Sequence, residues 1–381
     1  MTRFIHTSDW QLGMTLHFLS PESQARYSQA RIDAVADIGR VAAERDCEFV
    51  VVCGDVFETS RVSRQVVARA CEAMAAIPVP VLLLPGNHDP LDAGSVYTSD
   101  CFTTRQPSNV RLLTGNDSER PVSGVEVLGA PWRSKRPLED LLARACLDLA
   151  PDPTVLRILV GHGVVDSLDP DRDNPAQING SQLEASLIAR RVHYVALGDR
   201  HSTTNVGATG RLWYSGTQEV TDFDEVDPGN VLVVDLGLPT SDEPAGTVHV
   251  EPVGLGQWRF LRQRFELSDD TVGDLEQWLS ALPDKQRTVV KFSLVGALTL
   301  AGYSRVQTVL DHYVDLLAGL QRWERHTELV VLPDVGELDE LGLSGFAEQT
   351  LHQLVDEATA GDGNVVARDA LALLHRLAGA R

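Results

Sequence analysis

The sequence has no apolar run close to the ~20 residues that a membrane-spanning helix needs, and no apolar leader precedes its first predicted strand. Its five cysteines show no Cys-x-x-Cys spacing. A disulfide framework is therefore not expected, and a reducing compartment suits the chain. These absences predict a cytoplasmic protein with no membrane association.

Positive charge is also scarce. Lys and Arg number 33 against 54 Asp and Glu, so the net charge is 33 − 54 = −21. Such a balance favours solubility and says little about fold. Nucleic-acid-binding proteins normally carry a basic footprint, so any DNA contact here must use a local basic patch, bound metals or a partner.

The first half of the chain alternates apolar runs with helical spacing. Helices are predicted over 21–45, over 60–77 with Ser60 as the cap, and over 137–149. Between them lie five short apolar runs that read as buried strands, at 4–7, 49–53, 81–84, 156–160 and 194–197. This alternation is typical of an α/β fold.

Each of these five runs is followed at once by polar side chains. The stretches are 8–11 (SDWQ), 54–58 (GDVFE), 86–89 (GNHD), 161–163 (GHG) and 198–201 (GDRH). Ligands at the carboxyl ends of strands in one sheet converge on one crevice. Aspartates, an asparagine and histidines that converge there suit a pair of divalent metals, which activate water and polarise phosphoryl groups. The pattern therefore predicts phosphoester hydrolysis.

The second half of the chain has a different pattern of predicted secondary structure. Short strands at 212–215, 231–236 and 247–253 are predicted to form the antiparallel side of a second sheet. Beyond a glycine-rich boundary at 254–256, strands at 258–267, 289–295 and 328–332 alternate with helices at 271–282 and 303–322, a βαβαβ unit. Helices at 344–358 and 364–379 end the chain. The predicted domains are thus 1–255, 256–335 and 336–381.

The order Asp-x-Gln, Gly-Asp, Gly-Asn-His-Asp, Gly-His, Gly-Asp-x-His resembles the calcineurin-like metallophosphoesterases. The opening FIHTSDWQLG at 4–13 is similar to the start of the SbcD/YhaO-like DNA repair exonucleases, nuclease subunits of bacterial double-strand-break repair complexes. The resemblance covers roughly residues 1–335, and Gly-Asn-His-Asp is its most specific element. It implies an α/β fold: a four-layer αββα metallophosphoesterase sandwich, a small βαβαβ capping domain that helps to select DNA, and a helical C-terminal tail.

The resemblance also implies how two metals would be held. Asp55 would bridge them. The remaining ligands would be Asp9, Gln11 and His201 for the first metal, and Asn87, His162 and Asp199 for the second. His88 would be catalytic, either protonating the leaving oxygen or stabilising charge on the phosphate, and Asp89 would orient the loop.

Two ligand positions depart from the family pattern, because Gln11 and Asp199 stand where the family normally has histidine. Both changes replace nitrogen with oxygen. This favours two manganese ions, with magnesium as the alternative, over zinc or iron. The same departures leave open a degenerate site that keeps the fold without the activity.

Three further groups of residues near these motifs have predicted roles. Arg200, between two ligand positions, would bind a phosphate oxygen of the substrate or form a salt bridge. Glu58 would make a hydrogen bond behind the ligands. The basic residues at 133–136 around Trp132 would hold a DNA backbone or form a solvated turn.

The predicted function is phosphodiester hydrolysis of DNA in repair, as a 3′–5′ exonuclease, a single-strand endonuclease or both. The resemblance implies an SbcC-like coiled-coil ATPase as partner, and a homodimer is a further assembly to test. Apolar residues of the C-terminal helices would dock the partner or pack on the protein's own core: Leu351, Leu354, Val355, Leu371, Leu373 and Leu374. The rival functions are a small or cyclic nucleotide phosphodiesterase, which does not need the unit after 256, and an inactive DNA-end-binding scaffold.

Overall fold

The computed structural model describes residues 1–115, 117–169, 171, 173–241, 246–332, 345–359, 364, 366–367, 369–371 and 373–374. The chain divides into two compact units. Unit 1 comprises Met1–Leu16 and Gln24–Trp258, and unit 2 comprises His17–Ser23 and Arg259–Arg381. Each unit has its own hydrophobic core. No helix in the described ranges is both long enough and apolar enough to cross a bilayer.

The first sheet of unit 1 has the strand order β11-β10-β1-β2-β3-β4. Strands β1 (Thr2–Thr7), β2 (Val50–Cys53), β3 (Val81–Leu84) and β4 (Val110–Leu112) run parallel. Strand β10 (Asn230–Leu236) pairs antiparallel with β1, and the edge strand β11 (Val248–Gly254) pairs antiparallel with β10. Helices α1 (Pro21–Glu44) and α2 (Arg64–Ala75) pack on one face of this sheet through a shared core.

The second sheet has the order β5-β6-β7-β9-β8. Its strands are β5 (Val125–Gly129), β6 (Leu156–His162), β7 (Tyr194–Gly198), β8 (Thr204–Val206) and β9 (Leu212–Tyr214). Helices α4 (Leu141–Cys146) and α5 (Gly180–Ile188) cover one of its faces. The short η1 (Val96–Thr98) and α3 (Asp100–Thr103) lie between β3 and β4 in the chain.

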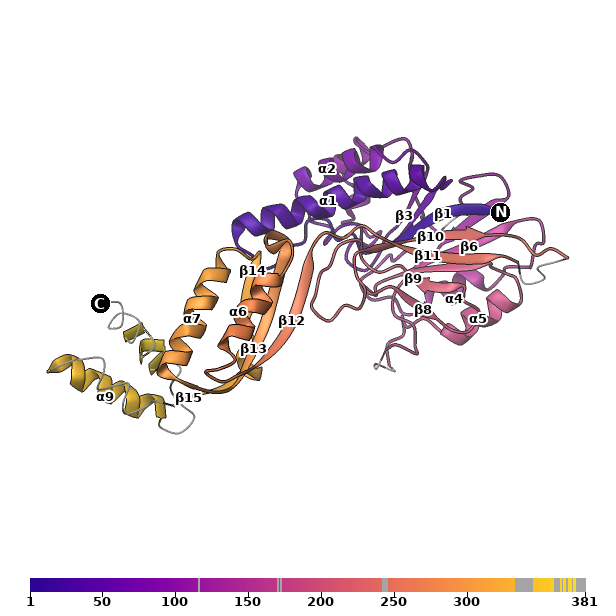
Figure 1. The fold of residues 1–381 in the computed structure, drawn as a ribbon. Coiled ribbons are helices and arrows are strands. Elements are labelled where there is room, and N and C mark those ends of the chain that lie inside the picture. The colour runs from indigo at the N-terminus through magenta and orange to yellow at the C-terminus, as the bar shows by residue number, and fades with distance from the viewer. Residues whose placement is uncertain are drawn as a thin grey trace. The chain divides into compact units, whose positions relative to one another are not determined.

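A third apolar cluster joins the two sheets. It combines residues of β1, β2 and β3 with residues of β5, β6 and β7, including Phe4, Phe49, Val51, Ile158 and Val160. In each buried strand one set of alternate residues faces the helices and the other faces the opposite sheet. The layers are therefore helix, sheet, sheet, helix, which confirms the predicted sandwich; Figure 1 shows α1 and α2 on one side and α4 and α5 on the other.

Three predictions for unit 1 need correction. Strands β10 and β11 extend the first sheet, not the second, because β10 pairs with β1. Helix α2 is capped by Ser63, whose side chain accepts from the Val66 N–H, and not by Ser60. Helix α4 is much shorter than 137–149 because Asp140 caps it and it ends at Cys146.

Unit 2 is a parallel sheet with helices along one face (Figure 1). Strand β12 (Arg259–Leu267) pairs with the long β13 (Thr288–Thr299), which pairs in turn with β14 (Gly319–Arg322) and β15 (Glu328–Leu332). Helices α6 (Val272–Ala281) and α7 (Leu300–Val314) supply the covering face, and η2 (Lys285–Arg287) and η3 (Glu324–His326) are single turns. The predicted helix 303–322 was wrong at its end, since 319–322 form β14.

The C-terminal segment packs onto unit 2. Helix α9 (Phe346–Thr359) and described residues of 366–374 supply five of the six proposed docking residues to the unit 2 core. Leu351 and Leu371 are buried in it, and Leu354, Val355 and Leu374 pack against it partly buried. Leu373 is 48% exposed. The structure thus supports packing on the protein's own core rather than a free docking face. Residues 333–344, and half of the predicted helix 364–379, lie outside the described residues.

Candidate metal centre

Four of the predicted ligand positions have left-handed backbone. The φ angles are 55° at Asp9, 41° at Gln11, 52° at Asp55 and 98° at Asp199. Non-glycine residues rarely adopt such angles, and strain of this kind gathers at functional sites. Each of these residues follows a strand of the sandwich (β1, β2 or β7), where the chain turns sharply enough to aim the side chain at the crevice.

Glycines make room for these side chains. A Cβ on Gly54 would stand 2.2 Å from His162 Nδ1, and a Cβ on Gly86 would stand 2.2 Å from Asp55 Oδ1. A Cβ on Gly198 would stand 1.9 Å from the Cys53 carbonyl oxygen. Glycine at these three points lets the strand ends approach each other closely enough to bring their ligands together.

His162 lies at the centre of one half of the site. Its Nε2 is 2.9 Å from Asn87 Oδ1, 3.4 Å from Asp55 Oδ2 and 3.6 Å from Asp199 Oδ1. Its Nδ1 is 2.8 Å from the Cys53 carbonyl oxygen, which can only accept. The Nδ1–H therefore donates there, and Nε2 faces the oxygen atoms of the three predicted ligands.

The other half contains Asp9, Gln11 and His201. His201 Nε2 is 4.0 Å from Asp9 Oδ1 and 3.3 Å from Gln11 Nε2. Gln11 Oε1 is buried and has no hydrogen-bond partner. A buried amide oxygen without a partner is costly unless a cation completes it. Ligand atoms of Asp9, Asp55 and His162 all lie within 4.8 Å of one another, so the residues fit a metal centre.

Charges within the site shift the ionisation of its members. Burial raises the pKa of Asp9 and of Asp199. Burial would also raise the pKa of Asp55, but His162 and the His88 main-chain N–H outweigh it and hold that pKa below its ordinary value. Burial opposes protonation of His162, yet Asp55 and the other carboxylates raise the pKa of His162 well above its usual range. In the absence of metal, the site therefore binds protons, and a bound cation would displace them.

A calcineurin-like phosphoesterase family model matches residues 2–236, which is more than half of the sequence. The chain belongs to the calcineurin-like phosphoesterase family. It is therefore a metal-dependent hydrolase, and the matched range contains every ligand position described above.

Curated relatives share the family at low identity. The chain is 23% identical over 254 residues to the D subunit of the nuclease SbcCD from Bacillus subtilis, covering 58% of this chain and 63% of that protein. It is 31% identical over 93 residues to the corresponding protein of Rhodobacter capsulatus, covering 23% of this chain and 22% of that protein. The chain thus spans less than two thirds of either relative.

Solved structures also match. A Thermus thermophilus protein aligns with a TM-score of 0.40 and 9% identity, covering 67% of this chain and 99% of that one. A dimetal phosphatase from Danio rerio aligns with a TM-score of 0.39 and 12% identity, covering 67% and 96%.

In this phosphoesterase, His88 borders the metal centre. Its Nδ1 donates to the Glu58 carbonyl oxygen at 2.8 Å, so its Nε2 is available to a substrate. His88, Glu58 and the ligand carboxylates Asp55 and Asp199 line one cavity of about 340 Å³. Glu58 contacts His88 through this main-chain oxygen, while its Oε2 is buried without a hydrogen-bond partner. The hydrogen bond of Glu58 thus goes to His88, which is not a predicted ligand, so a bond from Glu58 behind the ligands stays a prediction.

Asp89 orients the loop that carries Asn87 and His88. Its buried carboxylate accepts from the N–H groups of Gly86 (2.8 Å) and Phe57 (3.0 Å) and from the Tyr97 hydroxyl (2.6 Å). Burial, with a contribution from the Asp55 charge, raises the pKa of Asp89 to about 6. Three hydrogen bonds to one carboxylate fix the loop between β3 and η1.

Sequence reasoning missed two residues that hold the ligands in place. Arg31 on α1 is buried, and its guanidinium donates to the main-chain oxygens of Trp10 (2.6 Å) and Asp9 (3.2 Å). Glu225 Oε1 lies 3.0 Å from His201 Nδ1. In the sequence Arg31 resembles any other arginine of a helix, and Glu225 is one of several acidic residues at 222–227. No sequence pattern therefore marks either residue as part of the site.

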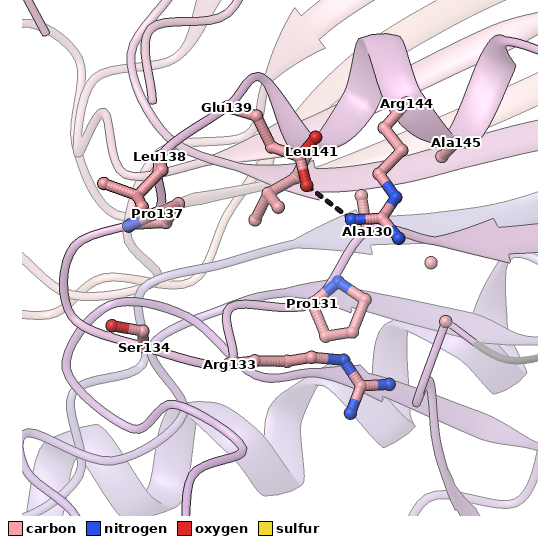
Figure 2. Close-up of a pocket in the computed structure, with 12 residues that line it drawn as sticks. Ala130, Pro131, Arg133, Ser134, Pro137, Leu138, Glu139, Leu141, Arg144 and Ala145 are labelled. Carbon is pink, nitrogen blue, oxygen red and sulfur yellow. Dashed lines mark hydrogen bonds and ion pairs between the residues drawn. The ribbon is translucent and has the colours of Figure 1, made fainter. Parts of the chain in front are cut away.

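Trp132 belongs to the core rather than to an open surface. Its indole N–H donates to the His162 carbonyl oxygen at 2.7 Å. The exposed residues 133–136 follow it, and Arg133 lines a separate hollow of about 600 Å³ with Arg144, whose ion pair with Glu139 is drawn in Figure 2. Arg200 Nε donates to the Thr204 hydroxyl at 2.9 Å, so phosphate binding by Arg200 stays a prediction.

Proposed function

We propose that this phosphoesterase is a two-metal DNA nuclease that hydrolyses phosphodiester bonds, with manganese favoured over magnesium. The observation that carries the proposal is that ligand atoms of Asp9, Asp55 and His162 lie within 4.8 Å of one another, with further donors on both sides. In the proposed site Asp55 is shared by two metal positions. One is next to His162 Nε2, and the other is next to His201 Nε2, which lies 3.3 Å from the side-chain nitrogen of Gln11. Two cations held there would polarise the phosphoryl group and activate water.

The position near His162 is rich in oxygen. Asn87 Oδ1, Asp55 Oδ2 and Asp199 Oδ1 all lie within 3.6 Å of His162 Nε2. Three oxygens with one imidazole suit manganese or magnesium better than a thiolate-rich or histidine-rich site would. Asp199 also donates its main-chain N–H to both oxygens of Asp9 (3.1 Å), which ties the two halves together.

His88 is the proposed general acid. Its ring borders the same cavity as Asp55, and its Nδ1 proton is held by the Glu58 carbonyl oxygen. A protonated ring would then give its Nε2 proton to the leaving oxygen as the P–O bond breaks. The main-chain N–H of His88 donates to Asp55 Oδ1 at 2.9 Å, which holds the ring beside the metals without making it a ligand.

DNA repair, exonuclease or single-strand endonuclease specificity, and an SbcC-like coiled-coil ATPase as partner are parts of the same proposal. They rest on the names of the two curated relatives, each of which is the D subunit of a nuclease SbcCD. The family membership alone supports only phosphoester hydrolysis. The proposal also includes that the protein forms a homodimer and is located in the cytoplasm.

The test is manganese-dependent cleavage of labelled single- and double-stranded DNA by the purified full chain, with and without the partner ATPase. End-labelled substrates separate exonuclease from endonuclease products. The Asp55→Asn variant is the matched control, because it should bind the same DNA without cleaving it. Hydrolysis of cyclic nucleotides with no cleavage of either DNA would contradict the proposal.

A further inference from the structure

Two of the ligands proposed for the second metal come from different sheets. Asn87 follows β3 of the first sheet, and His162 ends β6 of the second sheet. Asn87 Oδ1 nevertheless lies 2.9 Å from His162 Nε2. A metal site accepts errors of only about 0.2 Å in its ligand distances. Contacts between the loops of the two sheets must therefore fix these side chains relative to each other.

Trp132 contacts the chain next to both ligands. Its main-chain N–H donates to the Pro85 carbonyl oxygen at 3.1 Å, and its own carbonyl oxygen accepts from the Leu91 N–H at 2.8 Å. These two bonds lie on either side of the loop that carries Asn87. The indole N–H donates to the His162 carbonyl oxygen at 2.7 Å. One residue thus holds the Asn87 loop through its backbone and His162 through its side chain.

The indole is buried beside His162. Trp132 is 9% exposed, and its ring meets the His162 ring edge to face, with the ring centres 6.2 Å apart. The Nδ1–H of His162 donates to the Cys53 carbonyl oxygen at 2.8 Å. The histidine is therefore fixed at its ring by Cys53 and at its main chain by Trp132, which leaves Nε2 in a defined position.

The segment that carries Trp132 has open space on its other side. Its neighbours Pro131 and Arg133 line the hollow of about 600 Å³, whose opposite wall includes Leu141 of α4 (Figure 2). A segment beside a hollow can move into it, so packing on that side does not fix Trp132. The bonds on the inner side, among them the one to His162, therefore set the position of the segment.

Tyr214 on β9 holds the chain just after His162, but it does so differently. Its hydroxyl donates to the Gly163 carbonyl oxygen at 2.8 Å and accepts from the Val165 N–H at 2.9 Å. Both contacts are to the loop that follows β6, which is a strand of the same sheet as β9. Tyr214 thus fixes the loop within one sheet, whereas Trp132 joins loops of both sheets.

We propose that Trp132 is a positioning residue of the metal centre, which places Asn87 and His162 at one metal position by joining the loops that carry them. The inference rests on the proposed two-metal site and deepens it, because it names a residue that brings ligands of the two sheets together. In this role Trp132 contacts neither metal nor substrate. Removal of a partner behind the ligands usually weakens metal binding by about 10–100-fold.

The experiment compares Trp132→Phe with Trp213→Phe in the full chain. Trp213 on β9 is the matched control, because its indole N–H donates to the Gly210 carbonyl oxygen at 2.9 Å. Each variant thus loses one indole N–H that donates to a main-chain oxygen, and each keeps an aromatic ring. Manganese binding is measured by calorimetry without DNA, and thermal unfolding in EDTA reports the stability of each variant.

Trp132→Phe should weaken one manganese site by about 10–100-fold and leave the other site close to the parent's. Trp213→Phe should bind both ions as the parent does. The effect of Trp132→Phe should be smaller when it is added to Asn87→Ala than when it is added to the parent. Without the Asn87 side chain, the placement of its loop no longer matters, so the two changes are not additive.

Hydrogen exchange of the parent tests the same relationship without a substitution. If Trp132 strengthens metal binding, bound metal must strengthen the bonds of Trp132, because coupling between binding and structure is reciprocal. Manganese should therefore slow the exchange of main-chain N–H groups at 130–133, although this segment supplies none of the proposed ligands. Exchange at 272–281, in helix α6 of unit 2, should not change.

Three results would overturn the inference if the parent binds two manganese ions. They are equal affinities in Trp132→Phe and Trp213→Phe, equal weakening of both sites in Trp132→Phe, and unchanged exchange at 130–133 when manganese binds. A parent that binds fewer than two manganese ions would instead overturn the proposed two-metal site, and this inference with it.

Discussion

His201 Nδ1 lies 3.0 Å from Glu225 Oε1, on the side of the ring opposite the metal centre. Burial disfavours protonation of His201, but the bond to Glu225 and the charge of Asp9 raise the pKa of His201. A carboxylate behind a ligating histidine fixes its tautomer and makes its other nitrogen a stronger donor. In the proposed site, Glu225 would thereby prepare His201 Nε2 to bind a cation beside Gln11.

The first prediction removes that carboxylate. Glu225→Ala should weaken the first metal site by about 10–100-fold, the usual effect of losing such a partner, and leave the second site nearly unchanged. Manganese titration by calorimetry resolves the two sites. The control is Glu251→Ala, which removes an exposed carboxylate paired with Arg45. Equal weakening of both sites would show that Glu225 supports the fold rather than His201.

The second prediction separates catalysis from metal binding. His88→Ala should retain both metals, because its ring contacts Glu58 and not the donors around His162. Turnover should fall by about 10²–10⁴-fold, the usual contribution of a general acid. Metal content by mass spectrometry is measured on the same samples as DNA cleavage. Loss of metal together with activity would make His88 a ligand.

The third prediction concerns Gln11, whose buried Oε1 lacks a partner. An amide oxygen binds transition metals less well than an imidazole does, so activity should need free manganese and fall on dialysis. Gln11→His should tighten the first site and raise activity at low manganese. In the companion variant Asp199→His, the second site should prefer zinc or iron more than it does in the parent. Unchanged metal affinity in Gln11→His would remove residue 11 from the metal centre.

The fourth prediction concerns acid stability. His6 is fully buried in β1, with Nδ1 3.1 Å from the Tyr194 hydroxyl and Nε2 3.0 Å from the Leu197 carbonyl oxygen. Burial lowers the pKa of His6 from 6.5 to about 3. Between these values the unfolded chain binds the extra proton, so this contribution to stability is complete above pH 6.5 and is lost as the pH falls toward 3.

One proton corresponds to about 1.4 kcal/mol of unfolding free energy per pH unit in that window. Urea unfolding in EDTA at several pH values should therefore show a shallower pH dependence in His6→Gln than in the parent. Parallel pH profiles for the two proteins would mean that His6 is charged in the folded state.

Much of this account follows from the sequence because it depends on local patterns. The run at 81–84 forms a strand with the predicted bounds, and the other four runs form strands that differ from the prediction by a few residues at one end. The motifs after β1, β2 and β3 lie at one end of the first sheet because these strands are parallel. The expectation that all five motifs follow strands of one sheet was wrong, because β6 and β7 belong to the second sheet. Their motifs meet those of the first sheet only because the two sheets pack face to face. The Gly-Asn-His-Asp motif located the most specific part of the site.

The failures have a common physical cause, which is that tertiary contacts decide between locally similar choices. Residues 319–322 continue a helical pattern, but pairing with β13 makes them a strand. Strand β10 joins the first sheet because its residues pair with β1, a contact between segments far apart in the chain. Arg31 and Glu225 support the ligands through the fold, and no spacing in the sequence marks them.

The most direct test of the central claim is the metal stoichiometry and DNA cleavage of Asp55→Asn beside the parent. Asp55 Oδ2 lies 3.4 Å from His162 Nε2, and ligand atoms of Asp55, Asp9 and His162 lie within 4.8 Å of one another. In the proposed site Asp55 is the bridging carboxylate, which holds two cations at about 3.5–4 Å. The parent should bind two manganese ions and cleave DNA. The variant should lose at least one ion and should not cleave DNA even at saturating manganese. Two tightly bound ions with near-normal cleavage in Asp55→Asn would contradict the central claim.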